Sequence, residues 1–361
     1  MMIDELGFLP SSFPGRGRFL AEILMSPFLA ASVVLLAWSF GSLPLHAEAA
    51  CNRTRLQITT PALASTPYVV LDVGGRRGPW LLDFGSTITS VYADAWTAPG
   101  LGGSVPLFDF GFFGAGHGPR TLPAVKGGRN RVGVGSPLGT LGTDILKTVT
   151  TEIHLEDAAD PHVVFLDPSC DGAVPARERY ARFGQANFFS SHPEAHVSNL
   201  PNVPVVFVEL EERSTDRQRL RLPEPKRSPR TWAQVDTGYD DTYWPYAVDI
   251  NEAYLAQLKD AVPSLTLAGL VPVSGCGRED TLRDVYVAPG WRLNIVPDIP
   301  QRPIPFDSFH LIVKPRSTGC GGIGPMPMPA AQLGASFLRA FGTTILAPTR
   351  AEMWVKLPGH D

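Results

Sequence analysis

The 361-residue sequence has little charge of either sign and no pattern of metal-binding residues. Charged residues make up 18% of the chain, and the formal net charge is −4 with a pI near 6.1. Such a composition gives no overall attraction to nucleic acid or to an anionic membrane, so we expect neither as a partner. The four cysteines form no Cys-x-x-Cys pair and no Cys/His spacing typical of zinc, so we expect no metal and no cofactor.

Long helical segments are also disfavoured by the composition. The chain contains 35 prolines and 35 glycines, and both residues interrupt helix interiors. With 44% hydrophobic residues, the chain is long enough to form one large domain or two ordinary ones, and disorder is not indicated. The composition therefore predicts a folded, β-rich protein with many turns.

The first 49 residues have the features of an export signal. Arg16 and Arg18 precede an apolar run from Phe28 to Phe40, and Ala47-Glu48-Ala49 forms a small-x-small cleavage site. The apolar run has 13 residues, whereas a membrane span needs about 20. We therefore expect residues 1–49 to be removed and the protein to be exported to the periplasm or the extracellular space. An uncleaved N-terminal anchor is the alternative.

All four cysteines lie beyond the predicted cleavage point. Four thiols in an exported protein indicate two disulfides, for which three connectivities exist. We favour Cys51 with Cys170 and Cys276 with Cys320, because this pairing keeps each bridge within one half of the chain. Free buried thiols are the alternative.

An aspartate that follows apolar residues and precedes a glycine occurs twice. Asp83 precedes Gly85 in PWLLDFGSTITSVY, and Asp236 precedes Gly238 in AQVDTGYDDTYW. A glycine at this place allows a tight turn and a close approach of another backbone. Two turn aspartates that cap their own loops are the alternative, since Asp before Gly is ordinary turn chemistry.

The segments around the two aspartates repeat as well. A pattern of alternating apolar residues predicts a β-hairpin before each one, at 68–83 and, with a longer connection, at 203–236. Downstream, LGTDILKTVTTEIHLED (141–157) aligns with LGASFLRAFGTTILAPT (333–349), and each reads as Leu-Gly, a short amphipathic helix and a strand. This repeat predicts a duplicated all-β protein of two lobes.

With these two loops and the segment that follows each, residues 55 to 357 resemble the aspartic protease superfamily. The run Asp236-Thr237-Gly238-Tyr239-Asp240-Asp241-Thr242 is similar to the Asp-Thr-Gly-Ala-Asp-Asp-Thr of retropepsin-like proteases. The two-lobe layout and the late cysteine pair look more like pepsin. The resemblance implies two lobes built as closed β-barrels, an active site in the cleft between them, and a β-hairpin flap from the first lobe.

We expect the N-terminal lobe to span 50–170 and the C-terminal lobe to span 203–361, joined by a linker at 171–202. The linker region is rich in small and polar residues and lacks clear periodicity. The second lobe contains a segment, 213–230, with seven basic residues and three prolines. We expect it to be a solvated, enlarged hairpin loop, with binding to an anionic surface or partner as the alternative.

Two neighbouring carboxyl groups can hydrolyse a peptide bond without metal. Their repulsion makes them share one proton, so one serves as the base for water and the other as the acid for the carbonyl oxygen. We therefore predict Asp83 and Asp236 as the catalytic pair, most active on the acidic side of neutral, and leave open which of them carries the proton.

Further residues of the two loops are expected to support this pair. Ser86 is predicted to orient Asp83 through a hydrogen bond. The resemblance implies that Thr237 bonds across to the opposite loop, and that Asp240 and Asp241 hold the substrate backbone.

The sequence departs from the family pattern at three places. Phe84 stands where the family has threonine or serine, so only half of the hydrogen-bonded grip between the loops can form. Tyr239 replaces a small residue and is expected to narrow the cleft. The flap tyrosine of pepsin-like enzymes has no match, and its possible substitutes are Phe108, Phe110, Phe112 and Phe113.

These features predict an exported, monomeric aspartic endopeptidase that acts on extended polypeptide. The alternative is a binding protein that has kept the protease scaffold and uses its cleft for a peptide or glycan; Phe84 and Tyr239 favour it. A processing enzyme with a single substrate is a third possibility.

Overall fold

The described residues cover most of both predicted lobes. The computed structural model describes residues 53–59, 66–96, 103–107, 120–125, 137–167, 180–184, 203–213, 224–241, 244–273, 281–297, 302–316 and 322–356. The chain divides into two units, 1–49 and 50–361, and every described residue belongs to the second. The predicted export signal and all four cysteines lie outside the described residues. Within that part of the chain, no helix is both long and apolar enough to cross a membrane.

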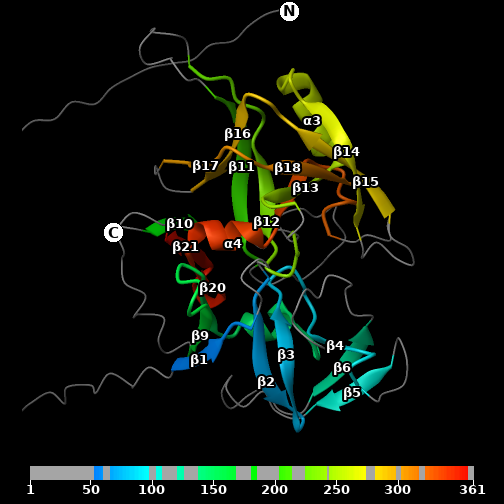
Figure 1. Cartoon of the computed structure of the whole chain (residues 1–361), viewed down its shortest axis with the longest axis vertical. Helices are drawn as coiled ribbons and strands as arrows, with labels where there is room; N and C mark the ends of the chain where they lie inside the picture. Colours follow the sequence, from blue (N-terminus) through cyan, green and yellow to red (C-terminus); the bar gives the residue numbers. More distant parts are fainter. Residues whose placement is uncertain are drawn as a thin grey trace, which may run out of the picture. The chain divides into compact units, whose positions relative to one another are not determined.

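The first lobe contains a six-stranded sheet, drawn from blue to cyan in Figure 1. Its strands are β2 (Tyr68–Val73), β3 (Arg76–Leu82), β4 (Ser90–Tyr92), β5 (Ser104–Leu107), β6 (Arg120–Val125) and β7 (Gly139–Leu141), in the order β2-β3-β7-β4-β6-β5. Gly74 and Gly75 have positive φ angles of 60° and 73°, which gives the β2–β3 hairpin the turn that its two-residue loop requires. The predicted first hairpin is therefore present.

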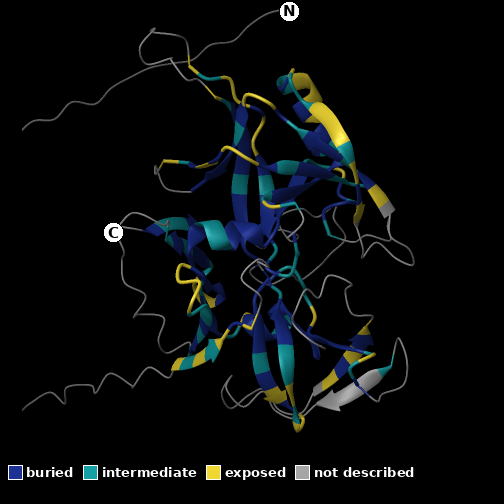
Figure 2. Cartoon of the chain, viewed as in Figure 1, coloured by how far each residue is buried: buried dark blue, intermediate teal, exposed yellow. Residues whose placement is uncertain are grey.

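The second lobe contains a nine-stranded sheet in the order β14-β15-β18-β13-β19-β12-β11-β16-β17. These strands are β11 (Val205–Glu212), β12 (Thr231–Val235), β13 (Ala247–Asn251), β14 (Thr266–Val273), β15 (Thr281–Val287), β16 (Trp291–Val296), β17 (Ile304–Phe306), β18 (His310–Lys314) and β19 (Ala330–Leu333). Helix α3 (Glu252–Ala261) follows β13, and the Asn251 side chain caps it by accepting a hydrogen bond from Tyr254 N at 3.0 Å. Figure 2 shows much of α3 exposed.

The two lobes use the same strand crossing to place their aspartates. β3 runs parallel to β7 with Leu82 opposite Leu141, and β12 runs parallel to β19 with Val235 opposite Leu333. The next residue in each lobe, the aspartate, donates its backbone N–H to the carbonyl of Leu141 at 2.9 Å and of Leu333 at 3.1 Å. The repeat seen in the sequence therefore corresponds to the same backbone hydrogen bond in each lobe.

A third sheet is shared by the two halves of the chain. It contains β1 (Arg53–Gln57), β8 (Thr150–His154), β9 (His162–Leu166), β10 (Tyr180–Gly184), β20 (Thr343–Ala347) and β21 (Glu352–Lys356), in the order β1-β9-β8-β20-β21-β10. At its centre, His154 pairs with Thr343 and Thr151 pairs with Leu346. A shift of 192 residues, the spacing of the repeated Leu-Gly segments at 141 and 333, converts one of these pairs into the other. The two halves thus meet in a two-fold arrangement.

The predicted all-β, two-lobed fold is confirmed, with one difference in how the sheets are built. None of the three sheets formed by the described residues closes on itself, so the expected closed barrels are replaced by open sheets. The sequence also did not predict the shared sheet, and β10 lies inside the predicted linker. The β5–β6 hairpin belongs to the first lobe, but its connecting residues 108–119, which include the expected flap phenylalanines, lie outside the described residues.

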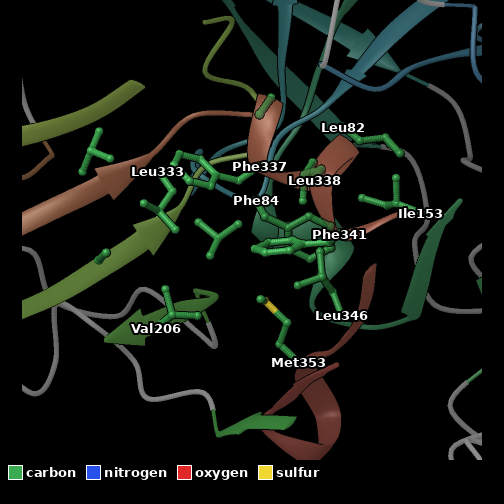
Figure 3. Close-up of a cluster of buried hydrophobic side chains, with 14 of the residues drawn as sticks. Leu82, Phe84, Ile153, Val206, Leu333, Phe337, Leu338, Phe341, Leu346 and Met353 are labelled. Carbon is green, nitrogen blue, oxygen red and sulfur yellow. The ribbon is translucent and has the colours of Figure 1, made fainter. Parts of the chain in front are cut away.

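Two short helices and the loop of Asp83 meet in one buried cluster. α1 (Thr143–Leu146) and α4 (Ser336–Phe341) follow β7 and β19, as the repeated Leu-Gly segments predicted. Phe84 is fully buried and belongs to the same cluster as Phe337, Leu338 and Phe341 of α4 (Figure 3). A residue of the first lobe therefore forms part of the core around a helix of the second.

We predict that Phe84→Ala lowers the free energy of unfolding by about 3–5 kcal/mol, because it leaves a cavity in this shared cluster. Equilibrium urea unfolding measures the change. Phe84→Leu, which keeps most of the volume, serves as the matched control and is expected to cost less. A loss below about 0.5 kcal/mol for Phe84→Ala, as for a surface site, would contradict the packing described.

Candidate active site

Each aspartate is held by the tight turn that follows its strand. Asp83 Oδ1 accepts hydrogen bonds from the backbone N–H groups of Gly85 at 2.8 Å and Ser86 at 3.0 Å. Asp236 Oδ1 accepts one from the N–H of Gly238 at 2.9 Å. Backbone donors of the turns therefore help to fix the orientation of both carboxyl groups.

The two aspartates face each other, and each lies against the glycine of the opposite loop. Their carboxyl groups are hydrogen-bonded to one another, and both residues are partly exposed. A Cβ atom built on Gly85 would overlap the Asp236 carboxyl group, and one built on Gly238 would overlap that of Asp83. The glycines are therefore required by the close approach of the loops, as the sequence predicted.

Thr237 ties the two loops together from beneath the pair. Its fully buried hydroxyl accepts a hydrogen bond from Phe84 N at 2.8 Å and donates one to Leu82 O at 2.7 Å. Gln234 adds a third link, from Nε2 to Gly85 O at 3.3 Å. Phe84 has no hydroxyl with which to reciprocate, and its ring goes instead into the shared cluster described above. The Asp236 loop is thus joined to the opposite lobe by hydrogen bonds, and the Asp83 loop by apolar packing.

Ser86 orients Asp83 differently from the expectation. Its backbone N–H reaches Asp83, whereas its hydroxyl donates to Ile88 O at 2.9 Å. The role predicted for the side chain is therefore carried by the main chain. Ile88 itself is 56% exposed and lies on the same loop, five residues after the aspartate.

The Tyr239 side chain is held by other residues of the second lobe. Its hydroxyl donates a hydrogen bond to Asp249 Oδ1 at 3.0 Å, and its ring packs on an apolar cluster that includes Val271, Val285 and Ile312. Burial, together with the nearby charge of Asp249, raises the pKa of Tyr239 well above its usual value. The expected narrowing of the cleft by this tyrosine stays a prediction.

Asp241 lies in a different place from the one that the resemblance implied. It is 4% exposed, and its carboxylate accepts hydrogen bonds from Ser336 N at 2.9 Å, from Ser336 Oγ and from Ala247 N at 3.2 Å. The residue therefore fixes the start of α4 against the loop, and its carboxylate is not directed at a substrate. Asp240, the next residue before it, is partly exposed, and its predicted contact with substrate stays a prediction.

The first lobe has an equivalent brace that sequence reasoning missed. Asp144 Oδ1 accepts hydrogen bonds from Thr89 N at 2.8 Å and Thr89 Oγ1 at 2.6 Å, and Gly142 N donates to Thr89 Oγ1 at 2.9 Å. Here the carboxylate is on the helix and the hydroxyl on the loop, the reverse of the second lobe. Asp144 and Ser336 are 192 residues apart, as the repeat requires. Thr89 and Asp241 are 152 residues apart, one fewer than the two aspartates of the pair, so the repeat alone did not align the two braces.

A set of polar side chains behind Asp236 was also missed. Gln332 Nε2 donates a hydrogen bond to Asp236 Oδ2, and Lys314 Nζ donates one to Gln332 Oε1 at 3.2 Å. Lys314 is 3.8 Å from a carboxylate oxygen of Asp249, which also pairs with Arg283 at 3.3 Å. These residues come from separate strands and carry no short motif, so nothing in the sequence brought them together.

The surroundings affect the pKa values of the two carboxyl groups differently. Burial raises the pKa of Asp83 well above its usual value, and the charge of Asp236 and the hydrogen bond with it raise it further. Burial also raises the pKa of Asp236, but the hydrogen bond from Asp83 and the positive charge of Lys314 lower it in part. Such a pair holds one proton over a range of pH. Among the described residues, no group of three or more His, Cys, Asp and Glu side chains is placed to hold a metal ion.

No family model and no curated protein matches the sequence. Among solved structures, the chain is similar to an aspartic proteinase from Irpex lacteus, with 14% identity and a TM-score of 0.42 over 85% of this chain and 98% of that one. It is also similar to the basic 7S globulin from soybean, with 12% identity and a TM-score of 0.41 over 84% and 95% of the two chains.

The fold is two-lobed and all-β, as the resemblance implied. The repeated strand crossing, the two aspartate loops and the shared sheet are the features that define it.

We predict that Gly85→Ala destabilises the protein by about 1–3 kcal/mol, because the added methyl group displaces the Asp236 carboxyl group. Urea unfolding measures this change. Gly269→Ala is the matched control, since a Cβ on Gly269 meets nothing within 4 Å. If the two variants are equally stable, the described contact between Gly85 and the Asp236 carboxyl group is contradicted.

Asp241 gives a prediction about stability and pH. Burial raises the pKa of Asp241 from 3.8 to about 6 in the folded state, despite hydrogen bonds that lower it. Asp241 therefore binds a proton more tightly in the folded protein than in the unfolded chain. This tighter binding stabilises the fold fully below about pH 4, and the stabilisation is lost as pH rises through about 6. Asp241→Asn removes the effect, so the stability of the wild type relative to the variant should fall by up to about 3 kcal/mol between pH 4 and pH 7. A difference that stays constant over this range would rule out the assignment.

Proposed function

We propose that this protein is an aspartic endopeptidase that hydrolyses peptide bonds of extended polypeptides with a water molecule activated by Asp83 and Asp236. The observation that carries the proposal is the pair itself. The two carboxyl groups are hydrogen-bonded to each other, partly exposed, and fixed by backbone donors against the opposite glycines. A paired carboxylate and carboxylic acid is the arrangement that metal-free amide hydrolysis needs.

The reaction follows from one shared proton. The ionised aspartate takes a proton from water as the oxygen attacks the scissile carbonyl, while the protonated aspartate gives its proton to the carbonyl oxygen, which yields a neutral gem-diol. The C–N bond then breaks. The amine leaves with the proton taken from water, and the other aspartate regains its proton from the diol. The pair ends in its starting state, and the reaction consumes one water for each bond cleaved.

The position of Tyr239 supports an enzyme over a binding protein. A side chain that filled the space between the aspartates would leave no room for water, and this tyrosine is bonded to Asp249 instead. The second departure, Phe84, is compensated by apolar packing on α4. Neither Tyr239 nor Phe84 therefore removes a part that the proposed chemistry uses.

The proposal includes the place where the protein acts. We propose that it is exported, that residues 1–49 are removed, and that the mature chain is a monomer with two disulfides. The export signal in the sequence supports this, and four cysteines without zinc spacing agree with an oxidising compartment.

The test is cleavage of a mixed peptide library between pH 3 and 7 by residues 50–361. We expect the wild type to cut, with Asp83→Asn and Asp236→Asn each reducing kcat/KM by about 10²–10⁴-fold, because each removes an acid or base. Asp260→Asn, an exposed change on α3, is the matched control and should retain full activity. Circular dichroism and urea unfolding show that each variant is folded.

The outcomes separate the proposal from its alternatives. A folded wild type that cuts no peptide, and binds no statine-containing peptide, would refute the enzyme and leave the peptide- or glycan-binding protein. A wild type that cuts only one or two sequences would point to the processing enzyme with a single substrate. Cleavage that survives both asparagine variants would place the activity elsewhere in the chain.

A further inference from the structure

The two aspartates are supported unequally, and the internal repeat makes the difference visible. Asp236 accepts a hydrogen bond from Gln332 on β19. The equivalent residue on β7 of the first lobe is Thr140, whose hydroxyl is 2.8 Å from the hydroxyl of Tyr92. Among the described residues, Asp236 is thus the only member of the pair that receives a hydrogen bond from a side chain outside it.

Lys314 fixes the direction of that hydrogen bond. Its ammonium group donates to Gln332 Oε1 at 3.2 Å, and the side chain of Lys314 is only 11% exposed. An ammonium group can only donate, so the amide oxygen of Gln332 must face Lys314 and its NH2 group must face Asp236. A fixed N–H donor stabilises the ionised form of a carboxyl group.

A cation also lies close behind Asp236. Lys314 is 3.8 Å from a carboxylate oxygen of Asp249, and Asp249 also pairs with Arg283 at 3.3 Å. The positive charge of Lys314 lowers the pKa of Asp236. A nearby positive charge favours the ionised form of a carboxyl group.

Other titratable groups also lie near Asp236. Asp83 faces it from the first lobe and shares the proton with it. On its own loop, Tyr239 is bonded to Asp249, and Asp241 is bonded to the start of α4. Asp240, between them, is partly exposed.

We propose that Lys314 and Gln332 are positioning residues that keep Asp236 ionised, so that the shared proton stays on Asp83. Asp236 is then the base that takes the proton from water, and Asp83 is the acid that protonates the carbonyl oxygen. This inference rests on the proposed function for the roles in catalysis, whereas the location of the proton is a property of the protein without substrate.

The first experiment measures the proton directly. Carboxyl ¹³C NMR of protein labelled at aspartate follows the titration, and Asp83→Asn isolates Asp236 from its coupled partner. In this background we expect Lys314→Met to raise the pKa of Asp236 by about 1 unit or more, because it removes a nearby positive charge. Lys314→Arg should restore the wild-type value, and Lys259→Met, the same change on the exposed face of α3, should leave it unaltered.

A second variant keeps the test decisive if Lys314→Met does not fold. Gln332→Leu removes the donor to Asp236 while it retains an apolar strand residue, and it should raise the same pKa. The proposal is overturned if both folded variants titrate as the wild type, or if the wild type carries the proton on Asp236. Because no substrate is present, this result stands even if the protein cleaves no peptide.

The second experiment tests whether Asp236 acts as the base in catalysis. The acidic limb of the kcat/KM profile reports ionisation of the base in the free enzyme. In Lys314→Met it should move to higher pH by the same amount as in the titration, while KM at the optimum changes little. A fall in activity without this shift would indicate a structural role for Lys314 and would contradict the positioning role.

Discussion

The contact of Thr237 with the opposite loop is the constraint on which the site depends. Two carboxyl groups repel each other when both are ionised, so a protein can hold them together only if something else joins their loops. The buried hydroxyl of Thr237 does this by bonding to Leu82 and Phe84 at once. Phe84 adds apolar packing against α4 from the other direction. The hydrogen bonds of Thr237 and the packing of Phe84 therefore hold the two aspartates close together.

The same arrangement makes protonation part of the architecture. Asp83, Asp236 and Asp241 all have raised pKa values, chiefly because the surrounding protein removes water from their carboxyl groups. In each case the folded state binds a proton more tightly than the unfolded chain, so each group contributes stability that weakens as pH rises. The low pH at which the pair shares one proton is therefore also the pH at which these carboxyl groups contribute most to the stability of the fold.

The sequence predicted the parts of this structure that have a local pattern. Hairpins, the two aspartate loops and the Leu-Gly-helix segments all appear as spacing within a few residues, and the repeat made them recognisable. The shared sheet was missed because β8 and β20 are far apart in the chain and their pairing leaves no local mark. Lys314 and Gln332 were missed for the same reason, as was the hydrogen bond from Tyr239 to Asp249.

The two-fold register of β8 and β20 has a consequence for the history of the site. The contact is isologous, so two identical halves could pair through the same edge as a homodimer. Such a dimer would have to carry the same residue at both equivalent positions, and symmetry would give the proton no preferred side. A single chain is free of that restriction. It can hold Gln332 in one half and Thr140 in the other, and so assign different work to two aspartates with a common origin in the repeat.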